Sequence, residues 1–367
     1  MNESNKNNST ISCQLQIVSD SIHLQQLYTG FDLLDKQGLI NLTQNINSQS
    51  SHYQNNKYKV AGVHTGGLRA IVNQNIKVFY DAVDAHALDH QALAWCDIYF
   101  KRSFNHSIHQ QMSDKVAPLD LNFMVHNDFT TLNSIQRRWA FGNVKDKIKA
   151  VIRELDTASH LSYLPRLKEL HCPPQPELPF NILFITRLWE PQFDQDYDLT
   201  PKQIADRKAI NDMRIDCIRA LKKEYGALFT GGVINSAYAQ SICPDIVFSQ
   251  SQLTQKRQYL NFLRQFSVCI TTTGLAGSIG WKFGEYIALS KAVVSEELLS
   301  QTFGQIQEGK HYLAFNNTEQ CLEQVKSLMN DEKRYAMMQN NYQYYLKFLS
   351  PDKLVLNSLK RVLSMPR

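Results

Sequence analysis

The stretch that decides the fold runs from Ile270 to Glu297, ITTTGLAGSIGWKFGEYIALSKAVVSEE. It continues an apolar, β-branched run that starts at Val268, as is typical of a buried parallel strand. Small residues interrupt the pattern, apolar residues return at helical spacing from Trp281 to Leu289, and Ala292-Val293-Val294 resumes a strand. This order predicts a βαβ unit, in which glycines before a helix let backbone N–H groups approach a phosphate. Close packing of the helix against the sheet is the alternative explanation for the glycines.

The predicted helix carries a carboxylate, Glu285, whose side chain can reach back along the helix towards the strand end. The run GLAGSIGWKFGEYIALSKAVVSE resembles the nucleotide-sugar-binding segment of GT-B glycosyltransferases. The resemblance implies that Glu285 holds the donor ribose and that the turn faces the donor diphosphate. The turn residues concerned are Gly274, Leu275, Gly277 and Ser278. Many retaining members carry a further Glu eight positions before the ribose-binding one, and here that position is Gly277, so the resemblance does not fix the stereochemistry.

Length and composition favour an enzyme-sized protein of two domains. The chain has 367 residues, of which 43% are hydrophobic, and a formal net charge of +5. That charge suits phosphorylated ligands or an anionic membrane surface and is too small to argue for nucleic acid. The sequence has no apolar run of membrane-spanning length, and its first residues lack the apolar region of a secretory signal. Seven dispersed cysteines indicate reduced thiols, so we expect a cytoplasmic protein.

The first part of the chain predicts a strand at 13–18 and a helix at 21–34, followed by a polar surface loop at 41–56. A strand at 58–63 would end in His64, Thr65, Gly66 and Gly67, where a helix should start. A histidine there is a candidate acid or base because its pKa lies near neutral, and an ordinary hydrogen-bonded loop histidine is equally compatible. We assign the three residues after it to the acceptor site.

Charged residues end the next two predicted strands. The strand at 76–80 delivers Asp81 and Asp84, which are candidates for catalysis or for capping the next helix. The strand at 96–100 delivers Lys101 and Arg102, which can bind an acceptor phosphate or carboxylate or form a solvated charge pair. The run YDAVDAHALDHQALAWCDIYFKRSF is similar to the N-terminal domains of bacterial polysaccharide glycosyltransferases. A basic, helix-rich segment follows at 132–170, and we expect its apolar stripe, which includes Trp139, to pack on the sheet. A basic amphipathic helix that lies on a membrane is the alternative.

A proline-rich linker at 171–179 predicts the domain boundary. The strand at 181–186 follows it and ends in Arg187, which resembles the GT-B position that supplies an arginine to the donor phosphates. A fixed cation stabilises the charge that a leaving nucleoside diphosphate gains, and Lys282 is a second candidate for this task. A surface salt bridge is the alternative role for Arg187.

Strands and helices continue to alternate to the end of the chain, which predicts a parallel doubly wound sheet. The resemblance implies the α/β GT-B fold, in which two Rossmann-like doubly wound domains face a central cleft. Residues 1–172 would bind the acceptor and residues 180–346 the donor. In this family a terminal helix, here 351–367, crosses back to the first domain.

The predicted function is transfer of a sugar from a nucleotide-diphospho-sugar to a polysaccharide, lipopolysaccharide or lipid-linked acceptor. We expect no metal and no cofactor, because cations and a helix dipole supply the positive charge. We also expect cytoplasmic location with peripheral contact to the inner membrane as an option, and no nucleic acid. Two alternatives stay open: a nucleotide-sugar epimerase of the same architecture, and a non-catalytic scaffold subunit that binds sugar nucleotides.

Overall fold

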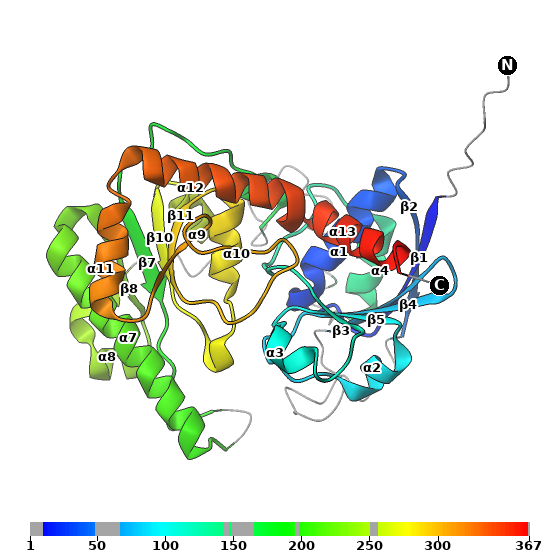
Figure 1. Ribbon diagram of the computed structural model, residues 1–367, viewed down its shortest axis with the longest axis horizontal. Helices are drawn as coiled ribbons and strands as arrows, with labels where there is room; N and C mark the ends of the chain where they lie inside the picture. Colours follow the sequence, from blue (N-terminus) through cyan, green and yellow to red (C-terminus); the bar gives the residue numbers. More distant parts are fainter. Residues whose placement is uncertain are drawn as a thin grey trace.

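A computed structural model describes residues 10–47, 67–141, 147, 165–194, 198–249 and 256–365. It contains two six-stranded sheets, each with its own helices, which lie side by side in Figure 1. The order of the first sheet is β2-β1-β3-β4-β5-β6, and that of the second is β12-β11-β10-β7-β8-β9. The α/β fold class is therefore confirmed.

The first sheet is mixed. Its strands are β1 (Ile11–Ile17), β2 (Ile40–Ile46), β3 (Gly67–Val72), β4 (Ile76–Asp81), β5 (Ile98–Lys101) and β6 (Val116–Pro118). β3 runs antiparallel to β1 and β4, whereas the other neighbours are parallel. Its helices are α1 (Gln25–Lys36), α2 (His90–Trp95), α3 (His106–His109) and α4 (Leu132–Phe141), and a short 3-10 turn, η1 (Ile22–Leu24), precedes α1.

The second sheet is parallel throughout and has a hydrophobic layer on each face. Its strands are β7 (Ile182–Thr186), β8 (Phe229–Ile234), β9 (Val247–Phe248), β10 (Val268–Thr271), β11 (Ala292–Glu296) and β12 (Leu313–Phe315). Its helices are α7 (Pro201–Tyr225), α8 (Ala237–Ile242), α9 (Lys256–Leu263), α10 (Trp281–Ala288), α11 (Thr318–Ser327) and α12 (Asp331–Tyr344). Thr200 caps α7 through a reciprocal capping box, and Pro201 occupies its first turn, as helix-start chemistry predicts. The short α6 (Leu167–Leu170) precedes residues 171–179, which contain neither helix nor strand.

The C-terminal helix joins the two halves. A π-helical turn (Tyr345–Leu349) links α12 to α13 (Pro351–Leu363), and the pair runs along the top of Figure 1 from the second half to the first. There α13 packs against α1, and its apolar residues Leu354, Val355, Leu359 and Val362 belong to the core of the first sheet. Gly30 of α1 allows this close approach, because a Cβ there would lie 2.1 Å from the carbonyl oxygen of Pro351.

Three predictions for the first half are wrong. Residues 41–46 of the expected polar loop belong to β2, because Ile40 and Leu42 point to the core while Asn41 and Thr43 stay exposed. Gly67 starts β3 and precedes no helix. Trp139, expected in a buried stripe, is 48% exposed on α4. The predicted strand at 58–63 and the second half of the expected helical segment lie outside the described residues.

Candidate functional site

The glycine turn after β10 is closed by its own hydrogen bonds. The Gly274 N–H donates to the Ser278 carbonyl at 2.8 Å, and the N–H groups of Gly277 and Ser278 donate to the carbonyls of Gly274 and Leu275, both at 3.2 Å. These three amides, predicted to hold the diphosphate, are therefore already paired. In the first turn of α10 the Phe283 N–H donates to the Gly280 carbonyl at 3.1 Å, so the N–H groups of Trp281 and Lys282 are the ones that lack an intrahelical partner. Gly280 at the N-cap offers no capping side chain. The helix start, rather than the turn, is the better anion donor here.

Glu296, which was not assigned from the sequence, fixes the residue before this turn by hydrogen bonds. Glu296, at the end of β11, accepts the Thr273 N–H at 2.7 Å and the Thr273 hydroxyl at 2.9 Å. Its position beside the turn follows from the parallel pairing of β10 and β11, which brings their carboxyl ends together. The sequence signal was present in the acidic pair that follows the strand.

Arg187 lies at the end of β7 and is exposed. Its guanidinium carbon is 4.1 Å from the centre of the Trp189 ring, a cation–π contact that orients the side chain. Among the described residues its guanidinium has no ion pair. Arg214 of α7 fixes the end of β7, because it donates to the Arg187 carbonyl at 2.7 Å and to the Thr272 hydroxyl at 2.8 Å. Burial lowers the pKa of Arg214 to about 10, so it stays charged at neutral pH.

Lys282 supplies a second cation from the first turn of α10. Its ammonium donates to the carbonyl of Ile185 on β7, which brings it to the same sheet edge as Arg187. Burial, followed by the nearby charge of Lys256, lowers the pKa of Lys282 to about 7, and Glu285 opposes this shift. A lysine that is half protonated at neutral pH gains from a bound anion, which favours its charged form.

Glu285 occupies an unexpected environment. It lies in the second turn of α10, its side chain is fully buried, and it forms an ion pair with Lys256 of α9. The residue is buried because α10 packs Phe283, Tyr286 and Ile287 into the core beneath the sheet. The contact of Glu285 with a donor ribose stays a prediction.

Two predicted site residues of the first sheet neutralise each other. Asp81 pairs with Lys101 at 2.8 Å and accepts the Tyr99 hydroxyl at 2.5 Å, and both charged residues are almost fully buried. The parallel register of β4 and β5 places Asp81 directly opposite Lys101. A carboxylate enclosed in this way cannot reach a substrate, so we leave this pair out of the candidate site.

Asp84 and Arg102 lie where the two halves meet. The buried Arg102 forms an ion pair with the half-exposed Asp84 and donates to the Ile279 carbonyl, just before α10, at 2.8 Å. Arg102 therefore joins the first sheet to the helix start of the donor side and is not a free acceptor-binding cation. Gly67, which was also predicted for the acceptor site, begins β3 and lines a hollow at the same edge of the sheet.

His23 is a residue that sequence reasoning missed. It lies in the turn between β1 and α1, and its ring makes an edge contact with Trp281, the first residue of α10, at 5.0 Å between centroids. Burial and Arg102 lower the pKa of His23, so the ring is neutral at pH 7. Nothing in the local sequence marks it, because its partner is more than 250 positions away. The predicted His64, Thr65 and Gly66 lie outside the described residues.

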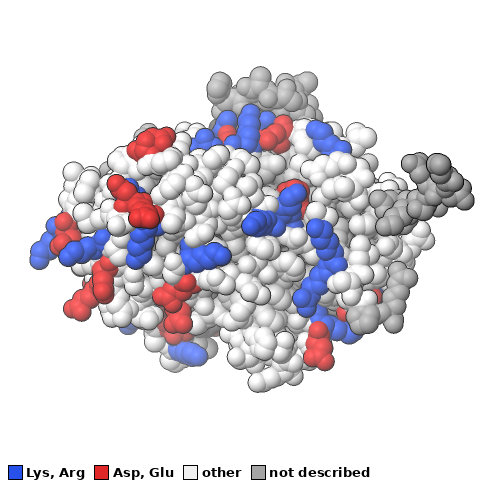
Figure 2. Space-filling model, turned by 45° about the horizontal axis from the view of Figure 1, so that its top comes forward, with Lys and Arg blue, Asp and Glu red and all other residues white. Residues whose placement is uncertain are grey.

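Metal ligands were not predicted, yet the chain has two overlapping Asp-x-Asp spacings, formed by Asp194, Asp196 and Asp198. Asp194 pairs with Arg207, and Asp196 lies outside the described residues. In the described part of the chain no three His, Cys, Asp or Glu side chains form a metal-binding group. No helix there is both long and apolar enough to cross a bilayer. Positive and negative side chains are interspersed over the face shown in Figure 2, so the net charge is not gathered into one large patch on that face.

The facing sheet edges and the shared C-terminal helix are the arrangement of the GT-B glycosyltransferases, as the sequence resemblance implied. No family model and no curated protein matches the chain. Among solved structures, a glycosyltransferase from Rickettsia africae is 10% identical with a TM-score of 0.41, covering 100% of this chain and 85% of the other. HepE from Anabaena, solved with UDP and glucose, is 10% identical with a TM-score of 0.39, covering 95% and 98%.

TarM from S. aureus, solved with UDP and two sugar ligands, is 10% identical with a TM-score of 0.41. The match covers 77% of this chain and 48% of TarM, so this chain spans about half the length of that protein. At such scores and identities these likenesses say nothing of activity. The function has to be argued from the residues of this chain.

Proposed function

We propose that this protein is a glycosyltransferase that takes a sugar from a nucleoside-diphosphate sugar. One observation carries the proposal: Arg187 and Lys282 converge on one edge of the second sheet, beside the N-terminus of α10, with no carboxylate bonded to either cation among the described residues. Two cations and a helix start form an anion site. Glycosyl transfer needs such a site because the leaving nucleoside diphosphate gains negative charge as the glycosidic bond breaks.

Residues of the first half would bind and activate the acceptor. The neutral ring of His23 can take the proton of an attacking hydroxyl, and Asp84, paired with Arg102, lies at the same junction. Their contacts with Trp281 and Ile279 bring these groups to the helix start where the diphosphate would bind. Arg187 and Lys282 supply the positive charge, so no metal step enters the proposal.

The acceptor class is a polysaccharide, a lipopolysaccharide or a lipid-linked sugar. Contact with a membrane surface is supported by α4, which leaves Leu132 78% exposed and Trp139 48% exposed next to Arg138. Apolar and aromatic side chains beside a cation suit the headgroup region of an anionic bilayer. An acceptor anchored in lipid would then meet the protein at that surface.

The test is a thermal-shift screen of the full chain against UDP, ADP, GDP, CDP and TDP. A ligand at about 100 times its Kd should add about 2.7 kcal/mol to the free energy of unfolding. We expect one nucleotide to stabilise the wild type and to lose its effect in Arg187→Ala and Lys282→Ala. Lys223→Ala, which removes an exposed cation of α7, is the matched control and should respond like the wild type. If no nucleotide stabilises the wild type, the donor site does not exist.

Product analysis separates transfer from the alternatives. An epimerase would isomerise the donor sugar without an acceptor, and a scaffold subunit would bind nucleotide without turnover. We expect the released nucleoside diphosphate to increase when an acceptor glycan is added. If the donor sugar is isomerised at a rate that does not depend on acceptor, the protein is an epimerase and the proposal of a transferase is wrong.

A further inference from the structure

Among the described residues, the first sheet has one face covered by a hydrophobic core and an opposite face that is covered only in part. In β1, Cys13, Leu15 and Ile17 belong to the core with α1 and α13. The alternate residues of the strand therefore point to the opposite face. There α2 covers β4 and β5, and Figure 1 shows α2 and α3 on the side of the sheet away from α1 and α13. Over β1, β2 and β3 the outward side chains of the described residues are polar, apart from the half-buried Ile71 of β3, and each is at least partly exposed.

The strand register arranges these side chains in two rows. Gln16 lies opposite Asn45 of β2 and Arg69 of β3, and Gln14 lies opposite Thr43 of β2. In the second row Gln14 also lies opposite Ile71 of β3, which is apolar, and Ile71 lies opposite Lys77 of β4. Since neighbouring strands lie about 4.8 Å apart, a row across four strands spans about 14 Å. We call the following set the polar face: Gln14, Gln16, Thr43, Asn45, Arg69 and Lys77.

The polar face carries two cations without carboxylate partners. Arg69 lies 4.9 Å and Lys77 5.9 Å from the centre of the Trp95 ring, which holds both charges at one side of the face. Neither has an ion pair among the described residues. The nearby Asp97 accepts the backbone N–H of Lys77 at 2.8 Å, not its ammonium.

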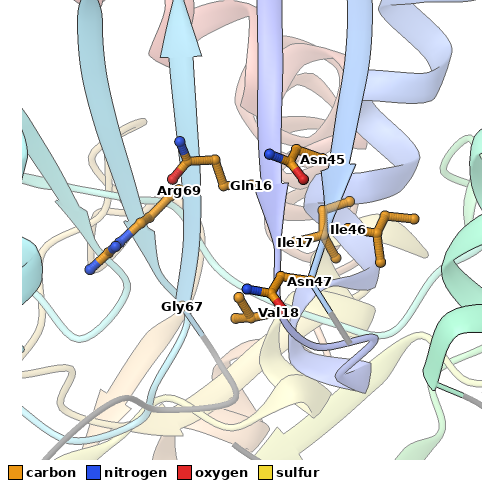
Figure 3. A pocket seen from close by; sticks show the side chains of 8 residues that line it. All are labelled: Gln16, Ile17, Val18, Asn45, Ile46, Asn47, Gly67 and Arg69. Carbon is orange, nitrogen blue, oxygen red and sulfur yellow. The ribbon is translucent and has the colours of Figure 1, made fainter. Parts of the chain in front are cut away.

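One end of the polar face is hollowed. A hollow of about 610 Å³ at the carboxyl ends of β1 and β2 is lined by Gln16, Asn45 and Arg69 together with the strand ends. In Figure 3 these three side chains come from three adjacent strands and lie on the same side of the sheet. The first row lines this hollow, and the second row lies two residues further from it along the strands.

Chemistry narrows the class of ligand. Amide and hydroxyl side chains both donate and accept hydrogen bonds, as sugar hydroxyls require, and Arg binds a carboxylate through two parallel bonds. The face has too few cations for nucleic acid, whose binding depends on many phosphate contacts. Its side chains are also too polar for a bilayer. We propose that the polar face binds an acidic glycan, a chain of hydroxylated sugars that carries carboxylates.

Calorimetric titration of the full chain with hexagalacturonate tests this, with neutral maltohexaose as the comparison ligand. We expect hexagalacturonate to bind, and maltohexaose to bind at least tenfold more weakly. The double variant Arg69→Ala, Lys77→Ala should weaken hexagalacturonate at least tenfold, as should added salt, which screens the exposed charges. Asn45→Leu, on an exposed position, should weaken both glycans. Lys223→Ala on α7 should change neither.

Absence of hexagalacturonate binding at millimolar concentration would overturn the proposal, and so would equal affinity for the two glycans. Light scattering tests the competing occupant, a second copy of the chain. If the wild type is a dimer and the double variant a monomer, the face is a protein interface and the glycan proposal fails. These measurements involve no nucleotide, so their failure is distinguishable from failure of the proposed transfer.

Discussion

The carboxyl edges of the two sheets both present charged residues, but they use them in opposite ways. At the first edge Asp81 and Lys101 face each other on neighbouring strands and form a buried pair, while Arg102 is joined to Asp84. At the second edge Arg187 rests on an aromatic ring and Lys282 bonds a carbonyl, so positive charge is left over. Cations near the carboxyl edge of a sheet are thus paired with carboxylates in the first half, whereas in the second half they have no carboxylate partner among the described residues and form the anion site that we propose.

The difference lies in what occupies the neighbouring strand. A cation opposite a carboxylate is neutralised and can be buried, which fixes the strands and excludes ligand. A cation next to an indole or a carbonyl is not neutralised by a carboxylate, so it is available to a bound anion. Mutations at the two edges should therefore separate stability from ligand binding.

The largest expected effect is on stability, at the first edge. Asp81→Ala leaves the buried ammonium of Lys101 without its partner and should lower the free energy of unfolding by about 3–5 kcal/mol. Urea unfolding measures this. The double variant Asp81→Leu, Lys101→Met should lose much less, because no charge is left uncompensated. Equal losses in the single and double variants would mean that the pair does not hold the strands together.

The next effect is on turnover, at the second edge. Arg187→Ala should lower kcat/KM for donor about 100-fold, because it removes a cation from the developing diphosphate charge. The unfolding midpoint should stay near that of the wild type, since Arg187 is exposed and has no ion pair among the described residues. Lys223→Ala should leave both quantities unchanged. A large loss of stability in Arg187→Ala would contradict the comparison of the two edges.

A smaller effect concerns pH. The pKa of Lys282 is about 7 in the free protein, and an anion favours its protonated form, so affinity for UDP should fall as pH rises above 7. The fall should approach tenfold per pH unit between pH 7 and 9, since one pKa unit corresponds to 1.36 kcal/mol. Titration calorimetry in this range avoids the phosphate ionisation near pH 6. In Lys282→Arg the dependence should vanish, and a slope that persists there would assign it to another group.

The smallest effect is on orientation. Trp189→Leu removes the ring beneath Arg187 but keeps the cation, and should weaken UDP about two- to fivefold, the range of a partly exposed cation–π contact. Trp95→Leu, which removes the ring beside Arg69, is the matched control and should leave UDP affinity unchanged. If both variants bind UDP like the wild type, the Trp189 ring has no role in placing Arg187.

The second sheet was predictable because its strands are buried on both faces. Continuous apolar runs such as 182–186 and 268–271 are recognisable as strands in the sequence. The residues that follow them, including Arg187, can then be placed at the strand ends. In β2 the outward Asn41, Thr43 and Asn45 removed the apolar signal, so a strand was taken for a loop. Of these outward residues, Thr43 and Asn45 belong to the polar face, to which we assign an acidic glycan.

Pairing of charges between strands could not be predicted from the sequence. That Asp81 meets Lys101, 20 positions away, depends on β4 and β5 being neighbours in register. The contact of His23 with Trp281 depends on how the two halves face each other. The position of a residue at a strand end thus identified it as a candidate. Only the tertiary structure shows which of these charged residues are neutralised by an ion pair and which are available to a ligand.

The place of α13 also matters while the chain is being made. The first sheet takes its last strand from residues 116–118, yet its core is completed by a helix that begins at Pro351. Roughly 230 residues must be translated in between, which takes about 10–50 s at ordinary rates of synthesis. During that interval the apolar side of α1 has no cover from this helix. We therefore expect the nascent protein to need a chaperone, or to delay the folding of its first half, until its last helix leaves the ribosome.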